Sequence, residues 1–528
     1  MQFGQLEIDP AVNPAVLDTA TWDVDRAVRI LRAVEMPYWH TLCQAVAEGG
    51  FPHHHRECTV YRGSWARRGA NVCALTRLSD GQHVFIEVGT ADGTLAELLH
   101  VMPLDRDLHL AIHAADAAAI RRYVREVRPD KGPRALGATP RLGIGTRMST
   151  SVWPGIWRAM AEGGFAANAI QNSVRELNRL EDVLAGRPAR TNYLYGFGSL
   201  AEGHTGSTFE GLWVAGVLEA LKADSQPIYG ADADHITVRR GPGGLERAKR
   251  IMDAARDYTF FTLDVSDVVD YALANAPASK YDTALNVVAE LSAYLGNLKG
   301  EVPFDLELSI DECPPQMDAA ACLTTEAELL FLIEELRRRG VPLTHIAPNV
   351  GVVKGQDYTG ADGLAGFERR IAGLQRIAVE HGIMLDFHSG DDLRSAARQV
   401  IGRATGGWNH FKISPSLQVI FGEVLHELDP ERFQFWWDDT LAYTRREAAA
   451  GSDFAAQCLR EYEGSGDPAP APHHSVFHHY NFASVGRRDE KGQFVHRDKF
   501  YRLPPEFYRE YHNRVHVFLC DVADDVFP

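Results

Sequence analysis

Tyr229-Gly230-Ala231-Asp232-Ala233-Asp234-His235 reads as a short β-strand that delivers an Asp-His pair at its end. Two further histidines stand in similar surroundings, in Leu385-Asp386-Phe387-His388-Ser389-Gly390 and in Trp408-Asn409-His410-Phe411-Lys412-Ile413-Ser414. His235 and His388 are 388 − 235 = 153 residues apart, which excludes a local finger-type site. We therefore expect a fold that brings distant strand ends together, as a barrel of parallel strands does.

Outward from these motifs, short apolar runs alternate with longer amphipathic stretches, one of them a helix opened by the capping box of Thr325–Glu328. This alternation predicts an α/β fold, and a (β/α)₈ barrel before an open sheet. Polar residues at the carboxyl ends of the strands would then share one face. The eight predicted strands are Arg141–Gly145, Phe165–Ile170, Pro227–Ala231, Phe260–Leu263, Phe304–Leu308, Leu343–Ala347, Ile383–Phe387 and Phe411–Ile413.

Three regions are expected along the chain. Residues 1–135 form an N-terminal α+β region, which the breaker-rich segment 128–134 separates from the rest. Residues 136–463 form the barrel, and residues 464–528 form a C-terminal segment that packs on the barrel or closes it. Within that segment, the aromatic run 477–482 is predicted as a lid over the site or as a ninth packing strand.

The composition excludes several classes of function. The formal charge is 54 − 71 = −17, which argues against nucleic acid as a main partner. No apolar run approaches the roughly 20 residues of a membrane span, and we expect a cytoplasmic protein with reduced thiols. Gly196-Phe197-Gly198 lacks the third glycine of a dinucleotide fingerprint, and Gly241-Pro242-Gly243-Gly244 lacks the Lys-Ser/Thr of a P-loop. We therefore expect no nucleotide cofactor.

Three neutral imidazoles, those of His235, His388 and His410, suit a divalent metal with open coordination positions. Asp234 is placed beside the first of them to move a proton. The alternative is that each histidine is partly buried and makes one ordinary hydrogen bond. Zinc, manganese, nickel and cobalt all fit imidazole with carboxylate, so the sequence leaves the metal open, as it leaves open whether the chain forms a homo-oligomer.

Acidic residues alternate along Phe304–Glu312, and an acid that faces into a barrel is costly unless it is paired or bound to metal. Glu307 and Glu312 are candidates for a fourth ligand or a proton carrier. Alternatively, Glu312 caps the next element and Glu307 pairs with a lysine or arginine. Lys354 and Arg239 are candidates to bind an anion, with ordinary surface charges as the alternative.

At these residues the chain resembles the tagaturonate epimerase family, whose members interconvert tagaturonate and fructuronate with a divalent metal. The resemblance covers about residues 190 to 520. It is carried by Tyr195-Gly196-Phe197-Gly198, Ala231–Ile236, Thr262–Ser266, Ser309–Glu312, Ala347-Pro348, Lys354–Tyr358, His388–Gly390, Phe477–Tyr480 and Gly486–Asp489. The site also looks like that of class II sugar aldolases.

The resemblance implies a metal-dependent barrel with His235 and His388 as ligands, a third histidine for which we choose His410, and Asp234 as proton acceptor. From its motifs we add Asp357, Ser389 and His479 to Lys354 and Arg239 as substrate-binding candidates. The family motif after His-Ser-Gly carries another serine and a lysine, whereas this chain has Asp391-Asp392-Leu393-Arg394. That departure leaves the group that binds the substrate's anionic end open.

The expected activity is epimerisation of a hexuronate ketose at a carbon β to its ketone. That C–H bond is not acidic, so we expect retro-aldol cleavage and aldol closure through an enediolate held by the metal. Asp234 would take the hydroxyl proton, and Glu312 or a nearby acid would return it. The alternatives are a class II-type sugar aldolase, a ketose isomerase, or a sugar-acid binding protein without catalysis.

Overall fold

The computed structural model of the chain describes most of its 528 residues. The described residues are 2–3, 6–7, 23–47, 54–89, 95, 98–146, 151–173, 187, 192–194, 198–200, 208–273, 276–314, 317, 319–353, 355–466, 469–490, 495–496, 499–500 and 503–528.

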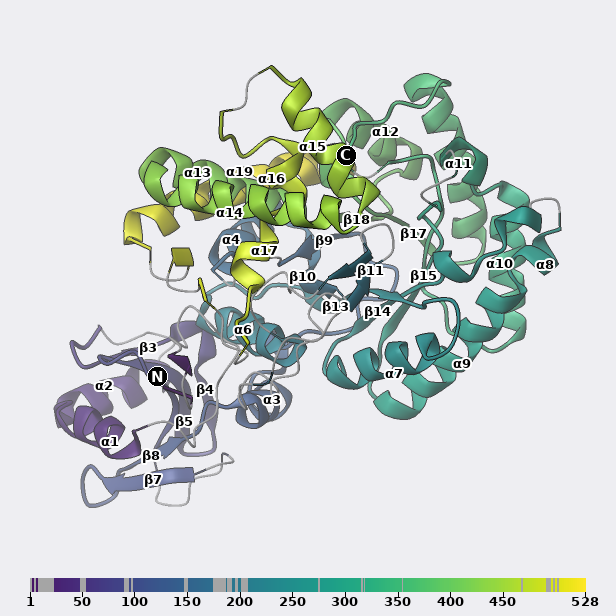
Figure 1. The fold of residues 1–528 in the computed structure, drawn as a ribbon. Helices are drawn as coiled ribbons and strands as arrows, with labels where there is room; N and C mark the ends of the chain where they lie inside the picture. Colours follow the sequence, from purple (N-terminus) through teal and green to yellow (C-terminus); the bar gives the residue numbers. More distant parts are fainter. Residues whose placement is uncertain are drawn as a thin grey trace.

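Eight parallel strands close into a barrel, which confirms the predicted fold class (Figure 1). Each of the eight predicted strands is present, and β18 pairs with β9 to complete the ring. The strands are β9 (Arg141–Gly145), β10 (Ala166–Ser173), β13 (Tyr229–Thr237), β14 (Phe260–Asp264), β15 (Asp305–Ser309), β16 (His345–Ala347), β17 (Met384–Phe387) and β18 (His410–Ile413).

Amphipathic helices surround the barrel and bury their apolar stripes against the strands. The predicted capping box is confirmed at the start of α10, where Thr325 and Glu328 bond each other's backbone. The helices that follow barrel strands are α4 (Trp153–Gly163), α6 (Phe209–Lys222), α7 (Gly244–Ala254), α8 (Pro277–Lys280), α9 (Asp282–Lys299), α10 (Glu326–Arg338), α11 (Gly363–Glu380) and α12 (Ser395–Thr405).

The seam between the last barrel strand, β18, and the first, β9, is covered by a helix from much later in the sequence. After β18 the chain leaves the barrel wall as α13 (Pro415–Leu428), α14 (Pro430–Ala449), α15 (Asp453–Gly464), α16 (Ser475–Tyr480) and α17 (Phe482–Gly486). The helix α19 (Pro505–Val526) then packs against both α4 and α12, which flank the β18–β9 seam. Asp525 anchors its end by accepting from Ser395 at 2.7 Å and Arg398 at 2.9 Å.

The N-terminal region contains a twisted antiparallel sheet, drawn in purple and blue in Figure 1. It meets the barrel at α6, where Gly63 lies so close to Ala223 that a Cβ there would be 1.8 Å from its carbonyl oxygen. The elements of this region are α1 (Val24–Arg32), α2 (Met36–Ala47), β3 (Cys58–Val60), β4 (Ala66–Arg68), β5 (Asn71–Leu78), β6 (His83–Gly89), β7 (Leu98–Pro103), β8 (His109–His113) and α3 (Ala117–Glu126). Two short hairpins, β1–β2 (Gln2–Phe3 with Leu6–Glu7) and β11–β12 (Asn192–Leu194 with Gly198–Leu200), complete the described strands.

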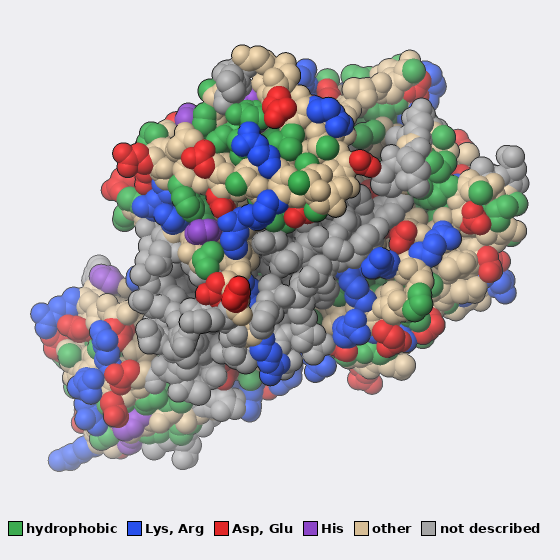
Figure 2. All heavy atoms as spheres, viewed as in Figure 1, with side chains coloured by type: hydrophobic (Ala, Val, Ile, Leu, Met, Phe, Trp, Pro, Cys, Tyr) green, Lys and Arg blue, Asp and Glu red, His purple; other side chains and the backbone are tan. Residues whose placement is uncertain are grey.

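On the face shown in Figure 2, basic and acidic side chains are interspersed, so neither sign of charge dominates it. Among the described helices, none combines the length and the apolar character needed to cross a membrane.

Candidate active site and metal centre

A bulge in β13 aims both members of the Asp-His pair into the barrel. Ala233 lies opposite Phe261 and Ile236 opposite Leu263, so β13 holds one extra residue between these positions. Adjacent side chains of a regular strand point to opposite faces. Here His235 has a φ of 48°, and both Asp234 and His235 contact inward-facing groups. A left-handed non-glycine residue costs about 1–3 kcal/mol, strain that proteins keep mainly at functional sites.

His235 belongs to a group of metal-type ligands at the carboxyl ends of the strands. Donor atoms of His235, Asp264 and Glu312 all lie within 4.8 Å of one another. His235 Nδ1 is 3.6 Å from Asp264 Oδ2, and the rings of His235 and His388 are 4.7 Å apart at their centroids. We call His235, His388, Asp264 and Glu312 the mouth group.

His388 directly follows β17 and is held between two acids. Its Nε2 lies 2.8 Å from Glu307 Oε1 and its Nδ1 lies 3.2 Å from Asp311 Oδ2. Burial alone would lower the pKa of His388, but Asp311 and Glu307 raise it well above its ordinary value. The next residue, Ser389, has a φ of 55°. It lines a cavity of about 50 Å³ together with Asp311, Glu312 and His388.

His410 opens β18, so it lies deeper in the barrel than His235 and His388, which stand near the carboxyl ends of their strands. Its Nδ1 is 2.7 Å from Asp386 Oδ2, and its side chain is fully buried. Burial, together with Lys412 and Arg141, holds the pKa of this imidazole well below its usual range. One ring nitrogen of His410 and one carboxylate oxygen each of Glu307 and Asp386 lie within 4.8 Å of one another. We call Glu307, Asp386 and His410 the inner group.

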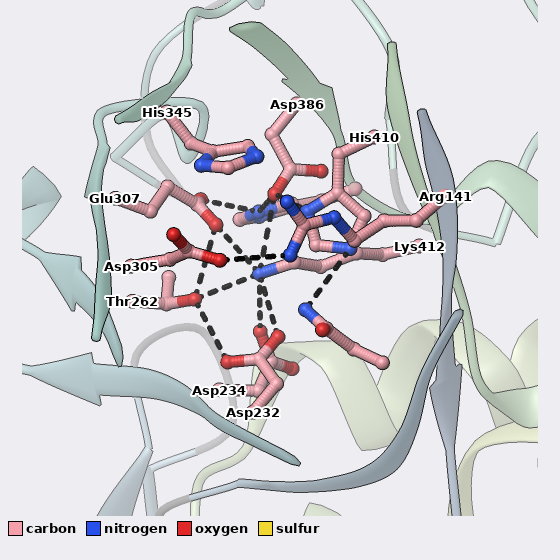
Figure 3. Close-up of polar contacts among 12 residues, drawn as sticks. Arg141, Asp232, Asp234, Thr262, Asp305, Glu307, His345, Asp386, His410 and Lys412 are labelled. Carbon is pink, nitrogen blue, oxygen red and sulfur yellow. Dashed lines mark hydrogen bonds and ion pairs between the residues drawn. The ribbon is translucent and has the colours of Figure 1, made fainter. Parts of the chain in front are cut away.

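Lys412 connects the inner group to Asp234, and sequence reasoning did not include it among the site residues. Its ammonium lies 2.7 Å from Glu307 Oε2 and 3.0 Å from Asp234 Oδ1 (Figure 3). Glu307 therefore pairs with a lysine while it also contacts His388. The signal for Lys412 was present in the sequence, because it follows His410 by two residues and a strand places such residues on one face.

Buried acids outnumber the ammonium that they surround, and the donors at the barrel mouth suit a divalent cation. Four carboxylates, those of Asp232, Asp234, Glu307 and Asp386, surround the single ammonium of Lys412. An excess of buried negative charge is costly unless protons or a cation compensate it. Imidazole and carboxylate donors at the barrel mouth are a ligand set that zinc, manganese, nickel and cobalt accept.

The Asp234 carboxylate is held in its ionised form by the cations around it. Burial alone would raise the pKa of Asp234, but His235, Lys412 and His388 bring it down to about 2. Its Oδ1 is bonded by Lys412, while its Oδ2 accepts from Gln171 at 3.4 Å and lies 4.0 Å from His235 Nε2. The carboxylate is therefore ionised at neutral pH, and it has one oxygen on the side of the mouth group.

The remaining predicted residues occupy different places. Arg239 is exposed just beyond the end of β13. Asp357 accepts from the backbone of Tyr358 at 2.9 Å and of Arg394 at 3.1 Å, so it fixes its own loop. His479 is buried in α16. Lys354 lies outside the described residues. The run 477–482 is helical, so the predicted ninth strand is wrong.

The departure from the family motif has a structural explanation. Asp391 accepts from the backbone N–H groups of Ser414 at 3.0 Å and Ser416 at 2.8 Å, where α13 begins. Asp392 accepts from Gly355 N at 2.7 Å and lies 3.0 Å from His478 Nε2. The two aspartates thus tie the loops after β16 and β17 to the helices that follow the barrel.

Replacing Gly355 by alanine is expected to loosen this connection. A Cβ at Gly355 would lie 2.6 Å from His479 Nε2, and the residue has a φ of 78°. The control is Gly340→Ala, with a φ of 74° and no atom within 4 Å of the added Cβ. We expect both variants to lose about 1 kcal/mol of stability from backbone strain, and Gly355→Ala to lose more and to bind substrate more weakly. Urea unfolding measures the loss of stability, and KM reports the weaker binding of substrate. Equal losses of stability in the two variants would show that the contact with His479 is unimportant.

Comparison with known proteins relates these residues to one enzyme family. Residues 276–434 match the model of the UxaE tagaturonate epimerase family. The match spans β15 to β18 and includes Glu307, Glu312, His388 and Lys412, and it confirms the predicted resemblance over these residues. The tagaturonate/fructuronate epimerase of Thermotoga maritima is 27% identical over 362 residues, which cover 60% of this chain. The aligned part spans 66% of that relative's length.

Solved structures extend the likeness to the whole fold. A glycerol-bound crystal structure of fructuronate-tagaturonate epimerase UxaE from Cohnella laeviribosi matches with a TM-score of 0.65 and 18% identity, over 92% of this chain and 99% of that one. The native structure of that enzyme gives a TM-score of 0.64 and 17% identity, over 93% and 99% of the two chains. At this level of identity, the likeness establishes the fold.

Proposed function

We propose that this protein is a divalent-metal-dependent epimerase that interconverts D-tagaturonate and D-fructuronate. The observation that carries the proposal is the ionised Asp234 carboxylate, which the β13 bulge places beside His235 and the mouth group. The family match and the curated relative support the choice of substrate.

The chain's own residues can perform the two proton transfers that the reaction needs. Asp234 accepts the proton of the hydroxyl on the inverting carbon as the neighbouring C–C bond breaks. The electron pair of that bond moves toward the ketone and leaves an enediolate and an aldehyde. After the aldehyde rotates and presents its other face, the bond forms again and the proton returns from Asp234 or Glu312. Proton transfer of this kind contributes about 10²–10⁴-fold to rate.

His235 and His388, with Asp264 or Glu312, would hold the metal, since these side chains form the mouth group. A divalent cation, when bound, supplies Lewis-acid stabilisation of the negative charge that develops on the ketone oxygen. Ser389 lines the cavity beside this group and is proposed to contact substrate, as are His479, Asp357, Lys354 and Arg239.

Metal removal tests the proposal. Chelated protein is incubated with tagaturonate, and fructuronate is followed by NMR before and after zinc, manganese, nickel or cobalt is added. We expect no conversion in the chelated sample and restoration by at least one metal. Release of a three-carbon fragment would identify an aldolase, and formation of an aldose would identify an isomerase. Binding of the sugar acid without conversion, under every metal, would overturn the proposal in favour of a binding protein.

The proposal includes the cytoplasm as the compartment of this enzyme. It rests on the scattered and odd-numbered cysteines of the chain, and on the absence of a membrane-spanning helix among the described residues. Fractionation of cells that express the protein tests it.

A further inference from the structure

The Lys412 ammonium is enclosed by oxygen atoms from four different barrel strands, β13, β14, β15 and β17 (Figure 3). The side chain is 3% exposed and reaches across the interior from β18. Five oxygens surround its Nζ: Glu307 Oε2 at 2.7 Å, Thr262 Oγ1 at 2.7 Å, Asp234 Oδ1 at 3.0 Å, Asp232 Oδ2 at 3.2 Å and Asp386 Oδ2 at 3.4 Å.

The neighbouring strands leave space for the stem of this side chain. Gly143 lies opposite Lys412 in the pairing of β9 with β18, and a Cβ there would be 2.6 Å from Lys412 Cγ. On another side the ammonium lies 5.2 Å from the centre of the Phe260 ring. The lysine is therefore confined to one path through the barrel, and its charge occupies a defined point.

This ammonium is unsuited to act as a nucleophile. Schiff-base formation needs the lone pair of a neutral amine. Four carboxylates, those of Glu307, Asp234, Asp232 and Asp386, lie 2.7 to 3.4 Å from Lys412 Nζ and stabilise its charged form. A permanent ammonium in this place can only orient and neutralise the groups around it.

Two of the carboxylates that Lys412 contacts belong to the inner group. Glu307, Asp386 and His410 present donor atoms within 4.8 Å of one another, which is a ligand set for a divalent cation. Lys412 contacts both acids of this set, so its positive charge repels a metal ion there.

We propose that Lys412 is a positioning residue that serves as a fixed internal cation: it aims the Asp234 carboxylate at the mouth and keeps divalent metal out of the inner group. The first part rests on the proposed function, while the second concerns metal binding alone. Removal of the charge should therefore have two separate consequences, one on turnover and one on the number of bound ions.

The test counts metal ions in Lys412→Met, which keeps the length of the stem and removes the charge. After equilibration with zinc or manganese and gel filtration, elemental analysis is expected to find one ion per wild-type chain and two per Lys412→Met chain. Adding Asp386→Asn to Lys412→Met removes an inner ligand and should restore one ion. The matched control is Lys299→Met, because Lys299 is also buried but bonds the carbonyl oxygens of Arg256 and Tyr258; it should bind one ion.

Turnover gives the second readout. We expect Lys412→Met to lower kcat about 100-fold with KM changed by less than about threefold, since the lysine acts on Asp234 and not on substrate. One bound ion together with a normal kcat would overturn the inference. If Lys412→Met does not fold, Lys412→Gln retains a hydrogen-bond donor without the charge, and one bound ion in that variant would also overturn it. A wild-type chain that binds no ion would instead count against the proposed function.

Discussion

Asp234→Asn is expected to lower kcat by about 10³-fold while the protein keeps its fold and its metal. The amide fills the same space and can still face Lys412, but it cannot accept the hydroxyl proton. NMR turnover assays and elemental analysis of the same sample measure both properties.

Asp232→Asn is the matched control for this prediction. Asp232 lies on the same strand and also contacts Lys412, at 3.2 Å, but two residues deeper. Burial raises the pKa of Asp232 well above its ordinary value despite the opposing effect of Lys412, and asparagine fills the same space as this side chain. We expect less than a tenfold loss. If Asp232→Asn were the inactive variant and Asp234→Asn the active one, the proton acceptor would have been assigned to the wrong acid.

Asp305→Ala is expected to destabilise the fold by about 3–5 kcal/mol, because it leaves the buried Arg141 guanidinium without its partner. The two side chains are 0% and 3% exposed, and Arg141 Nη1 lies 3.0 Å from Asp305 Oδ2. Asp305 also accepts from the backbone of Leu136 at 2.9 Å and Gly137 at 3.0 Å. Urea unfolding monitored by tryptophan fluorescence measures the loss.

The double variant Asp305→Ala/Arg141→Met tests whether the loss of stability comes from leaving Arg141 without its ion-pair partner. Because both charges are gone, we expect it to be more stable than Asp305→Ala alone. Turnover of the folded protein should change little, because both residues begin their strands, at the end of the barrel opposite the mouth. A loss below about 1 kcal/mol in Asp305→Ala would show that this ion pair contributes little.

The strands were predictable because each contains a short buried run between longer amphipathic stretches. In a parallel barrel both faces of a strand are covered, so such runs stand out from the amphipathic helices. The N-terminal sheet was harder. An α+β organisation was predicted for this region, but the order of its antiparallel strands depends on pairing between residues distant in the chain.

The candidate site was predictable only in part. Local sequence indicates that Asp234 and His235 stand together at a strand end, but not that a bulge turns both inward. The depth of His410 depends on the strand register, and so does the reach of Lys412 to acids on three other strands. Two of those contacts, with Glu307 and with Asp234, join residues 105 and 178 positions apart, and no local pattern carries them.

The position of α19 has a consequence for biosynthesis. The seam between β18 and β9 is covered by a helix that begins 505 − 413 = 92 positions after the last of these strands ends. Until then the apolar flanks of α4 and α12 lack their neighbour. We therefore expect the barrel to complete its folding only after translation has passed Val526, whereas the N-terminal sheet can form while the chain is still being synthesised. A chaperone that shields nascent apolar surface would find its binding site at this seam.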